Sequence, residues 1–327
     1  WSLSTQYQYN TDWQADNVSP ARVAAAEAAA AAAIRGVFGG GADGSGSVNV
    51  MEYITLGSTG NATDFGNLIA AASYVFNGQC ASTTRGIFAG GFTSDPNLDI
   101  IAYITIANTG NATDFGNLVA ASLGGASVSS ATRGVFMGGY TSSYANTIQY
   151  ITIANTGNTT DFGDLVAAAY GNSGFCSSTR GVSVGHQNSG GLSNRIDYIT
   201  IASTGNATDF GDLTVVRNFG GALGSSTRGL MGGGHPSSGV SDVIDYVTIA
   251  SAGNATDFGN LAETKATNAG VSSSIRGVFG GGQNASAHLN VMEYVTIAST
   301  GNSTDFGDLS GVHRLLGATS NGHGGIA

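Results

Sequence analysis

Lysine, proline and cysteine are scarce in this chain. It contains one lysine, Lys265, with 3 prolines and 2 cysteines among 327 residues. Charged residues make up only 10%, against about 25% in an ordinary globular domain. The 11 Lys and Arg residues face 21 Asp and Glu residues, a net charge of −10 that argues against nucleic acid as a partner, because phosphate contacts need clustered basic side chains. No run of 18 apolar residues occurs, so we expect no transmembrane helix and no membrane insertion.

Glycine is abundant, and the sequence repeats. The 52 glycines and 41% hydrophobic residues indicate many short strands joined by tight turns, not a disordered chain. Three columns recur with a period of about 48 residues. They are the arginines Arg35, Arg85, Arg133, Arg180, Arg228 and Arg276, the tyrosines Tyr53, Tyr103, Tyr150, Tyr198, Tyr246 and Tyr294, and the aspartates Asp64, Asp114, Asp161, Asp209, Asp257 and Asp305. In every unit the tyrosine precedes the aspartate by 11 residues.

Each unit is typical of four short strands, here called a to d. In the last complete unit we expect them at 270–274, 276–282, 292–298 and 304–309. The sequence Ser-Thr-Gly-Asn between strands c and d predicts a tight turn, because Gly and Asn tolerate positive φ angles. A repeated four-stranded unit of this length predicts an all-β fold, a β-propeller of four-stranded blades.

The two ends of the chain predict the number of blades. Trp1 lies 11 residues before Asp12, as the column tyrosines do before their aspartates, and His323 follows a stretch that resembles strand a. We therefore expect residues 1–16 and 317–327 to complete a seventh blade, which makes residues 1–327 a single seven-bladed domain without an open edge. The alanine-rich residues 23–33 would then supply strand a of the first blade. Since the sequence begins with Trp1, we expect it to be processed or part of a longer chain.

The repeat resembles the kelch family of propellers. The resemblance rests on the diglycine after strand b, as at Gly280-Gly281, and on the aromatic residues of strands c and d. Strand d differs from the family in having Phe where kelch repeats usually have Trp. The amino-acid sequence of Arg276–Gly282 and Thr304–Leu309 looks like kelch-like repeats of bacteriophage virion proteins, especially from marine and cyanobacterial phages. The resemblance implies a non-enzymatic virion component, tail- or fibre-associated, whose partners are other virion proteins and a host-surface glycan or receptor.

The repeated charges and the cysteines have structural interpretations. We expect each column aspartate to cap its turn and pair with a column arginine, which itself contacts an aspartate or a c–d turn carbonyl. A calcium site at each aspartate is the alternative, but one carboxylate supplies too few ligands. Cys80 and Cys176 are predicted to be buried thiols without a disulfide. The strand-b residues Phe38, Phe88, Phe136, Met231 and Phe279 are predicted to pack between blades.

No catalytic, metal or cofactor motif is found in the sequence. No His-Glu-x-x-His, Gly-x-Ser-x-Gly or P-loop pattern occurs, so we expect no enzyme and no cofactor. His186 and His235 follow glycine runs in adjacent units, yet no third metal ligand is evident.

The two faces of the predicted propeller differ in variability. The a–b and c–d turns recur almost unchanged, while the b–c loops vary in content at nearly constant length. Loops on a rigid scaffold often carry recognition, so we expect the variable face to bind a partner, with neutral drift as the alternative explanation. The candidate contact residues are Phe92, Tyr140, Tyr144, His186, His235 and His288. A secreted carbohydrate-binding propeller is the alternative function.

Overall fold

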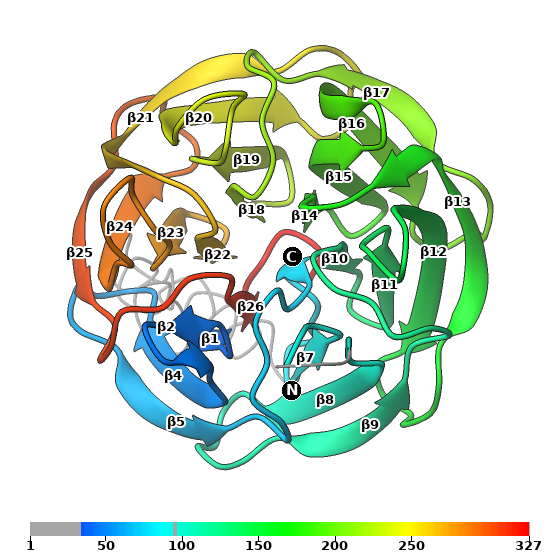
Figure 1. Cartoon of the computed structure of the whole chain (residues 1–327), viewed down its shortest axis with the longest axis horizontal. Coiled ribbons are helices and arrows are strands. Elements are labelled where there is room, and N and C mark those ends of the chain that lie inside the picture. The colour runs from blue at the N-terminus through cyan, green and yellow to red at the C-terminus, as the bar shows by residue number, and fades with distance from the viewer. Residues whose placement is uncertain (1–33, 94–96, 327) are drawn as a thin grey trace, which may run out of the picture.

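The computed structural model describes residues 34–93 and 97–326. This part of the chain is all-β and contains no helix, which confirms the all-β part of the fold prediction. Consecutive strands pair antiparallel into sheets that stand side by side around a central axis, as blades do in a propeller (Figure 1). Within the described ranges, no helix is long and apolar enough to cross a membrane.

Six radial units, here called blades 1 to 6 in the order of their arginines, make up the ring. Five of them have the predicted four strands, and blade 2 has three among the described residues. Blade 1 contains β26 (Gly317–Ser320), β1 (Arg35–Gly39), β4 (Val50–Thr55) and β5 (Thr63–Asn67). Blade 2 contains β7 (Arg85–Ala89), β8 (Ile100–Thr105) and β9 (Thr113–Asn117). Blade 5 contains β18 (Gly221–Gly224), β19 (Arg228–Gly232), β20 (Ser241–Thr248) and β21 (Thr256–Lys265). Blade 6 contains β22 (Ala269–Ser272), β23 (Arg276–Gly280), β24 (Val291–Thr296) and β25 (Thr304–Asp308).

Blades 3 and 4 are joined into one nine-stranded sheet. Blade 3 contains β10 (Ala126–Ser129), β11 (Arg133–Met137), β12 (Ala145–Thr152) and β13 (Thr160–Ala169). Blade 4 contains β14 (Ser173–Cys176), β15 (Arg180–Asn188), β16 (Gly191–Thr200) and β17 (Thr208–Asp212). The link is β6 (Asn77–Gly78), which pairs parallel with both β10 and β14. A small hairpin of β2 (Ala42–Asp43) and β3 (Gly46–Ser47) lies in the loop after β1.

The number of blades corrects the sequence prediction. Seven blades are wrong for the described residues, because blades 6 and 1 are direct neighbours. Arg276 of blade 6 donates from Nη1 to the Leu56 carbonyl of blade 1 at 3.0 Å, and the Gly60 amide of blade 1 donates to the Phe306 carbonyl of blade 6 at 2.8 Å. No space remains between them for another sheet.

The C-terminal strand closes blade 1, not a seventh blade. β26 pairs antiparallel with β1 from Gly36↔Ser320 to Gly39↔Gly317, so it takes the strand-a position that we expected residues 23–33 to fill. Residues 317–320 are thus strand a, as predicted, but of a different blade. The predicted strand b around His323 is a series of turns that reaches into the middle of the ring (Figure 1). The prediction for residues 1–16 lies outside the described residues.

The core repeats the same packing at each junction between blades. The strand-b aromatic residue of one blade lies against the diglycine of the blade before it. A Cβ added to Gly39 would lie 2.9 Å from the Phe88 ring, and one added to Gly280 would lie 2.8 Å from the Phe38 ring. These glycines leave the space that the rings fill, so the predicted packing of the strand-b residues between blades is confirmed.

The arginine and asparagine columns connect each blade to the next. Each column arginine stacks on the tyrosine of its own blade, with its guanidinium carbon 4.3–4.5 Å from the ring centroid. Its Nη1 donates to a carbonyl at the start of the next blade's c–d turn, over 2.7–3.2 Å. The c–d turn asparagines accept a backbone N–H of the preceding blade at 3.0–3.1 Å. The prediction that each column arginine contacts an aspartate or a c–d turn carbonyl is confirmed for the carbonyls. Among the described residues no ion pair joins a column arginine to a column aspartate, so the expected pairing of the two is wrong.

The axis of the ring is filled by β6 and polar side chains. Asn77 donates to the carbonyls of Gly220 and Asn268 at 3.3 and 3.0 Å. Gln79 donates to the Ser272 hydroxyl at 2.8 Å and accepts a hydrogen bond from Ser320 at 2.6 Å. The unit from Arg35 to Arg85 spans 50 residues where the others span 47 or 48, and these extra residues fall where the chain reaches inward. The centre is therefore a hydrogen-bonded plug.

Candidate functional site: an aromatic hollow on the loop face

The b–c loops and the d–a connections share one face of the ring, here called the loop face. On it, the first residue of each b–c loop forms an antiparallel bridge with a d–a connection. The bridged pairs are Ala42↔Arg314, Phe92↔Ser73, Tyr140↔Leu123, Gln187↔Tyr170, His235↔Asn218 and Gln283↔Ala266. One backbone arrangement thus holds six different side-chain combinations around the axis, which is how a rigid scaffold presents variable residues.

Aromatic side chains gather in one sector of this face. Tyr170 is central: its ring centroid lies 5.0 Å from Phe219, 5.7 Å from Tyr140, 6.1 Å from Tyr144 and 6.4 Å from Tyr74. The Tyr140 and Tyr144 rings also meet edge to face at 5.6 Å. All five side chains are half-buried, so their rings contact one another and still face solvent. These five residues are called the aromatic cluster.

A hollow of about 310 Å³ opens over the aromatic cluster. It is lined by Tyr74, Phe92, Leu123, Tyr140, Tyr144 and Tyr170. No charged side chain lines it within the described ranges. Burial and the neighbouring tyrosines raise the pKa of Tyr170, so its phenol stays protonated in ordinary buffers and acts as a hydrogen-bonding group.

Two members of the aromatic cluster have a strained backbone. Tyr74 and Phe219 both have φ of 54°, in the left-handed region that bulky residues rarely adopt. The equivalent residues in blades 3 and 4 are Gly124 and Gly171, with φ of 63° and 68°. A chain of backbone hydrogen bonds maintains this conformation: Gly124 donates to Tyr74, Gly171 to Gly124, and Phe219 to Gly171, over 2.7–2.8 Å. Thr267 and Leu315 occupy the same position in the remaining units, with φ of 59° and 60°, so the left-handed backbone is a property of the repeat that only glycine adopts without strain.

The predicted contact residues divide into those at the hollow and those elsewhere. Phe92, Tyr140 and Tyr144 line the hollow. His235 lies beside it, with its ring 6.5 Å from Phe219. His288 is half-buried in the loop of blade 6, outside the lining of the hollow.

The prediction that His186 contacts a partner is wrong. His186 is fully buried in β15, with its Nε2 3.1 Å from the Ser183 hydroxyl, and it is not available to a partner. Burial lowers the pKa of His186 to about 3, and the nearby Arg195 adds to that shift, so the ring is neutral. The sequence placed it in a loop because it follows a glycine, but β15 continues through Asn188.

Sequence reasoning missed Tyr74, Tyr170 and Phe219. These residues lie in the d–a connections, which the prediction left out in favour of the b–c loops. A partial signal was present, because two of the aligned positions hold glycine, Gly124 and Gly171, while the other two hold Thr267 and Leu315.

The opposite sector of the loop face is polar. Arg314 donates to Gln283 Oε1 at 2.6 Å, and Gln283 Nε2 lies 3.3 Å from His235 Nε2. Asn218 donates to Gln187 Oε1 at 2.9 Å, at the boundary with the aromatic cluster. The loop face is therefore divided into an aromatic and a polar half.

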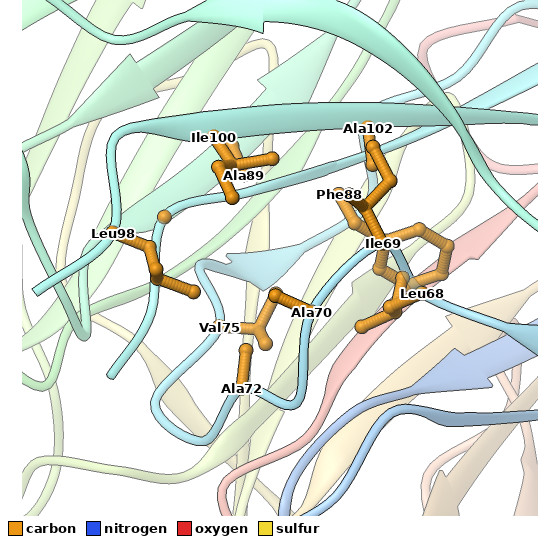
Figure 2. Close-up of a pocket in the computed structure, with 11 residues that line it drawn as sticks. Leu68, Ile69, Ala70, Ala72, Val75, Phe88, Ala89, Leu98, Ile100 and Ala102 are labelled. Carbon is orange, nitrogen blue, oxygen red and sulfur yellow. The ribbon is translucent and has the colours of Figure 1, made fainter. Parts of the chain in front are cut away.

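A second, smaller pocket lies between blades 1 and 2 (Figure 2). Its lining is apolar and includes Leu68, Val75, Phe88 and Leu98, and its volume of about 20 Å³ has room for little more than one water molecule. Ala72 and Ala102 line the same pocket.

Those two alanines occupy positions that carry buried ion pairs in other blades. The last residue of blade 5, Lys265, has its Nζ 2.6 Å from Glu293 in blade 6. Arg217, which precedes blade 5, has its Nη2 3.1 Å from Asp245 in that blade. The same two positions hold His313 and Glu52 at blade 1 and Ser122 and Gln149 at blade 3. In blade 4 the first position is Ala169, and Asp197 pairs with Arg195 of its own strand at 2.7 Å. The small pocket in blade 2 is where both positions are alanine.

A cysteine and a histidine meet near the axis. Cys176 Sγ is 3.7 Å from His323 Nδ1, and Ser129 Oγ is 3.3 Å from His323 Nε2. Burial raises the pKa of Cys176 to about 12 and lowers that of His323 to about 4, so both are neutral and the pair lacks the thiolate that a nucleophile needs. Both cysteines are buried and free, as predicted. Within the described ranges, no group of three or more His, Cys, Asp or Glu residues is arranged to hold a metal ion.

No protein-family model matches this chain, and no curated protein matches it in sequence.

Proposed function

We propose that this chain is a non-enzymatic adhesion component of a virion, a kelch-like six-bladed propeller that binds its partner with the loop face. The observation that carries the proposal is the difference between the two faces. Arginine, tyrosine and asparagine repeat on one face and connect the blades, while one backbone arrangement on the other face holds Ala42, Phe92, Tyr140, Gln187, His235 and Gln283. The second face carries the hollow that is lined by the half-buried tyrosine rings. The phage setting derives from the sequence resemblance.

The alternative is a secreted carbohydrate-binding propeller. A lectin of this shape, with a sugar site in each blade, would repeat its aromatic ligands six times. The aromatic cluster instead occupies one sector, which favours a single site of recognition. The two candidates differ in location: the virion component is found in purified particles and the secreted lectin is found free in the medium.

The experiment has two parts. Mass spectrometry of gradient-purified particles from the source culture should detect peptides of this chain. The isolated chain, added in excess, should then compete with those particles for attachment to host cells. A variant with Phe92→Ser, Tyr140→Ser and Gln187→Ser should lose the competition, whereas Thr109→Ser and Thr156→Ser on the opposite face should not change it.

Two results would contradict the proposal. The chain would not be a virion component if its peptides were found only in the particle-free medium. The loop face would not be the binding surface if the triple variant competed as well as the parent chain while both folded alike.

A further inference from the structure

The aromatic hollow has a composition that restricts its ligand. Its lining combines apolar ring faces with the hydroxyl groups of Tyr74, Tyr140, Tyr144 and Tyr170, each of which donates and accepts hydrogen bonds. Because no charged side chain lines the hollow within the described ranges, nothing there compensates the charge of a phosphate, a sulfate or a carboxylate. The chemistry therefore favours a neutral ligand.

The ring spacing does not suit an organic cation. A cage for an ammonium group holds it between aromatic faces, with each centroid within about 6 Å of the cation. Here Tyr140, Tyr144 and Tyr170 have centroids only 5.6–6.1 Å from one another, so the rings touch and leave no gap for a cation between them. The three rings are tilted at 49–80° to one another, so a flat ligand stacks on the face of one ring while the other rings meet its edge.

The size of the hollow limits the ligand further. Its volume of about 310 Å³ is at the lower end of the roughly 300–1,000 Å³ of small-molecule sites, which suits one or two sugar rings. A protein partner would need roughly 800 Å² of its surface to be buried, which this hollow alone cannot supply. A pyranose ring presents C–H groups on its faces and hydroxyl groups at its edge, which is the complement of a tyrosine-lined wall.

Tyr74 adds a further ring to the hollow from a left-handed backbone position. All six units have a positive φ at this position, including Thr267 and Leu315 outside the lining of the hollow, so the strain belongs to the repeat and is not specific to the site. The Tyr74 side chain reaches the Tyr170 ring and lines the hollow.

We propose that the aromatic hollow binds a neutral saccharide, stacked on one of the Tyr140, Tyr144 and Tyr170 rings and hydrogen-bonded to the hydroxyl groups of the others. This inference rests on the proposed function, since it names the ligand class of the loop face. It differs from a lectin with repeated sites because it assigns one site per chain.

The test is a titration of the whole chain with neutral sugars. Saturation-transfer NMR with the methyl glycosides of glucose, galactose and mannose, and with maltose, cellobiose and lactose, should identify at least one ligand. Isothermal titration should then show affinity about tenfold weaker for Tyr140→Ala and several-fold weaker for Tyr144→Phe, which keeps the ring and removes the hydroxyl group. Thr156→Ser, an exposed position in a c–d turn on the opposite face, should bind like the parent chain. Circular dichroism and thermal unfolding identify any variant that fails to fold.

The outcomes separate this inference from the proposed function. If the chain competes for attachment but binds no neutral sugar, the saccharide inference is wrong and the proposed function stands. Binding of choline, sialyllactose or a proline-rich peptide in place of the neutral sugars would overturn the inference in the same way. Equal sugar binding by Tyr140→Ala and the parent chain would place the site elsewhere. Failure in both the attachment and sugar experiments would overturn both proposals.

Discussion

Arg276 Nη1 donates to the Leu56 carbonyl across 3.0 Å, although 220 residues separate the two in sequence. The same guanidinium stacks on Tyr294 at 4.5 Å. This contact joins the last blade to the first, and five equivalent contacts join the other neighbours. The ring is therefore closed by the same interaction at every junction.

Loss of Arg276 should weaken this closure. Arg276→Ala removes one stacking contact and one charge-assisted hydrogen bond, and we expect the free energy of unfolding in urea to fall by roughly 1–3 kcal/mol. Asp305→Asn is the matched control in the same unit, because its side chain is exposed and in no ion pair among the described residues. An equal loss of stability in the two variants would contradict this role for the arginine column.

Deletion of residues 317–327 should open the ring. β26 supplies the inner strand of blade 1, and its removal exposes the edge of β1 and the buried Val37 and Phe38. We expect aggregation or a lower thermal midpoint, measured by size-exclusion chromatography and calorimetry. A synthetic peptide of residues 314–327, added in excess, should restore part of the stability. A truncated chain as stable as the full one would show that β26 is dispensable.

The contribution of the buried Lys265–Glu293 ion pair to stability can be measured against the alanine pair that stands at the same positions in blade 2. Lys265→Ala leaves the Glu293 carboxylate buried without its cation, and we expect a loss of about 3–5 kcal/mol in the free energy of unfolding. The double variant Lys265→Ala with Glu293→Ala reproduces the Ala72 and Ala102 combination of blade 2, so it should be more stable than Lys265→Ala alone. Urea denaturation of the single and double variants measures this coupling, and simple additivity would contradict it.

Acid should destabilise the protein through two buried histidines. Burial lowers the pKa of His186 to about 3 and that of His323 to about 4, below the ordinary value of 6.5. Between pH 6.5 and 4 the unfolded chain takes up protons that the folded chain does not, so stability falls as pH falls. Each histidine contributes a slope of up to about 1.4 kcal/mol per pH unit. Urea midpoints across this range should show a smaller slope for His323→Gln, and an unchanged slope would contradict the assignment.

Part of the candidate site was visible in the sequence. Phe92, Tyr140 and Tyr144 were predicted as contact residues because they stand in variable loops of constant length, and all three line the hollow. Tyr74 and Tyr170 were missed because the connection between blades looked like a linker. His186 was wrong because sequence does not show how far β15 continues into the loop.

The sequence by itself determined the all-β class and the period of the unit, because glycine positions, turn residues and strand alternation are local properties that each unit repeats. It also determined the small residues of the inner strands, such as Gly270, which face crowded neighbours. Only the tertiary structure decided that β26 pairs with β1, which makes six blades. A strand a placed after the last strand d looks the same in sequence whether it opens a new blade or closes the first. The number of blades depends on whether the last blade lies directly beside the first. The hydrogen bond from Arg276 to the Leu56 carbonyl shows that it does, and no single repeat specifies that contact.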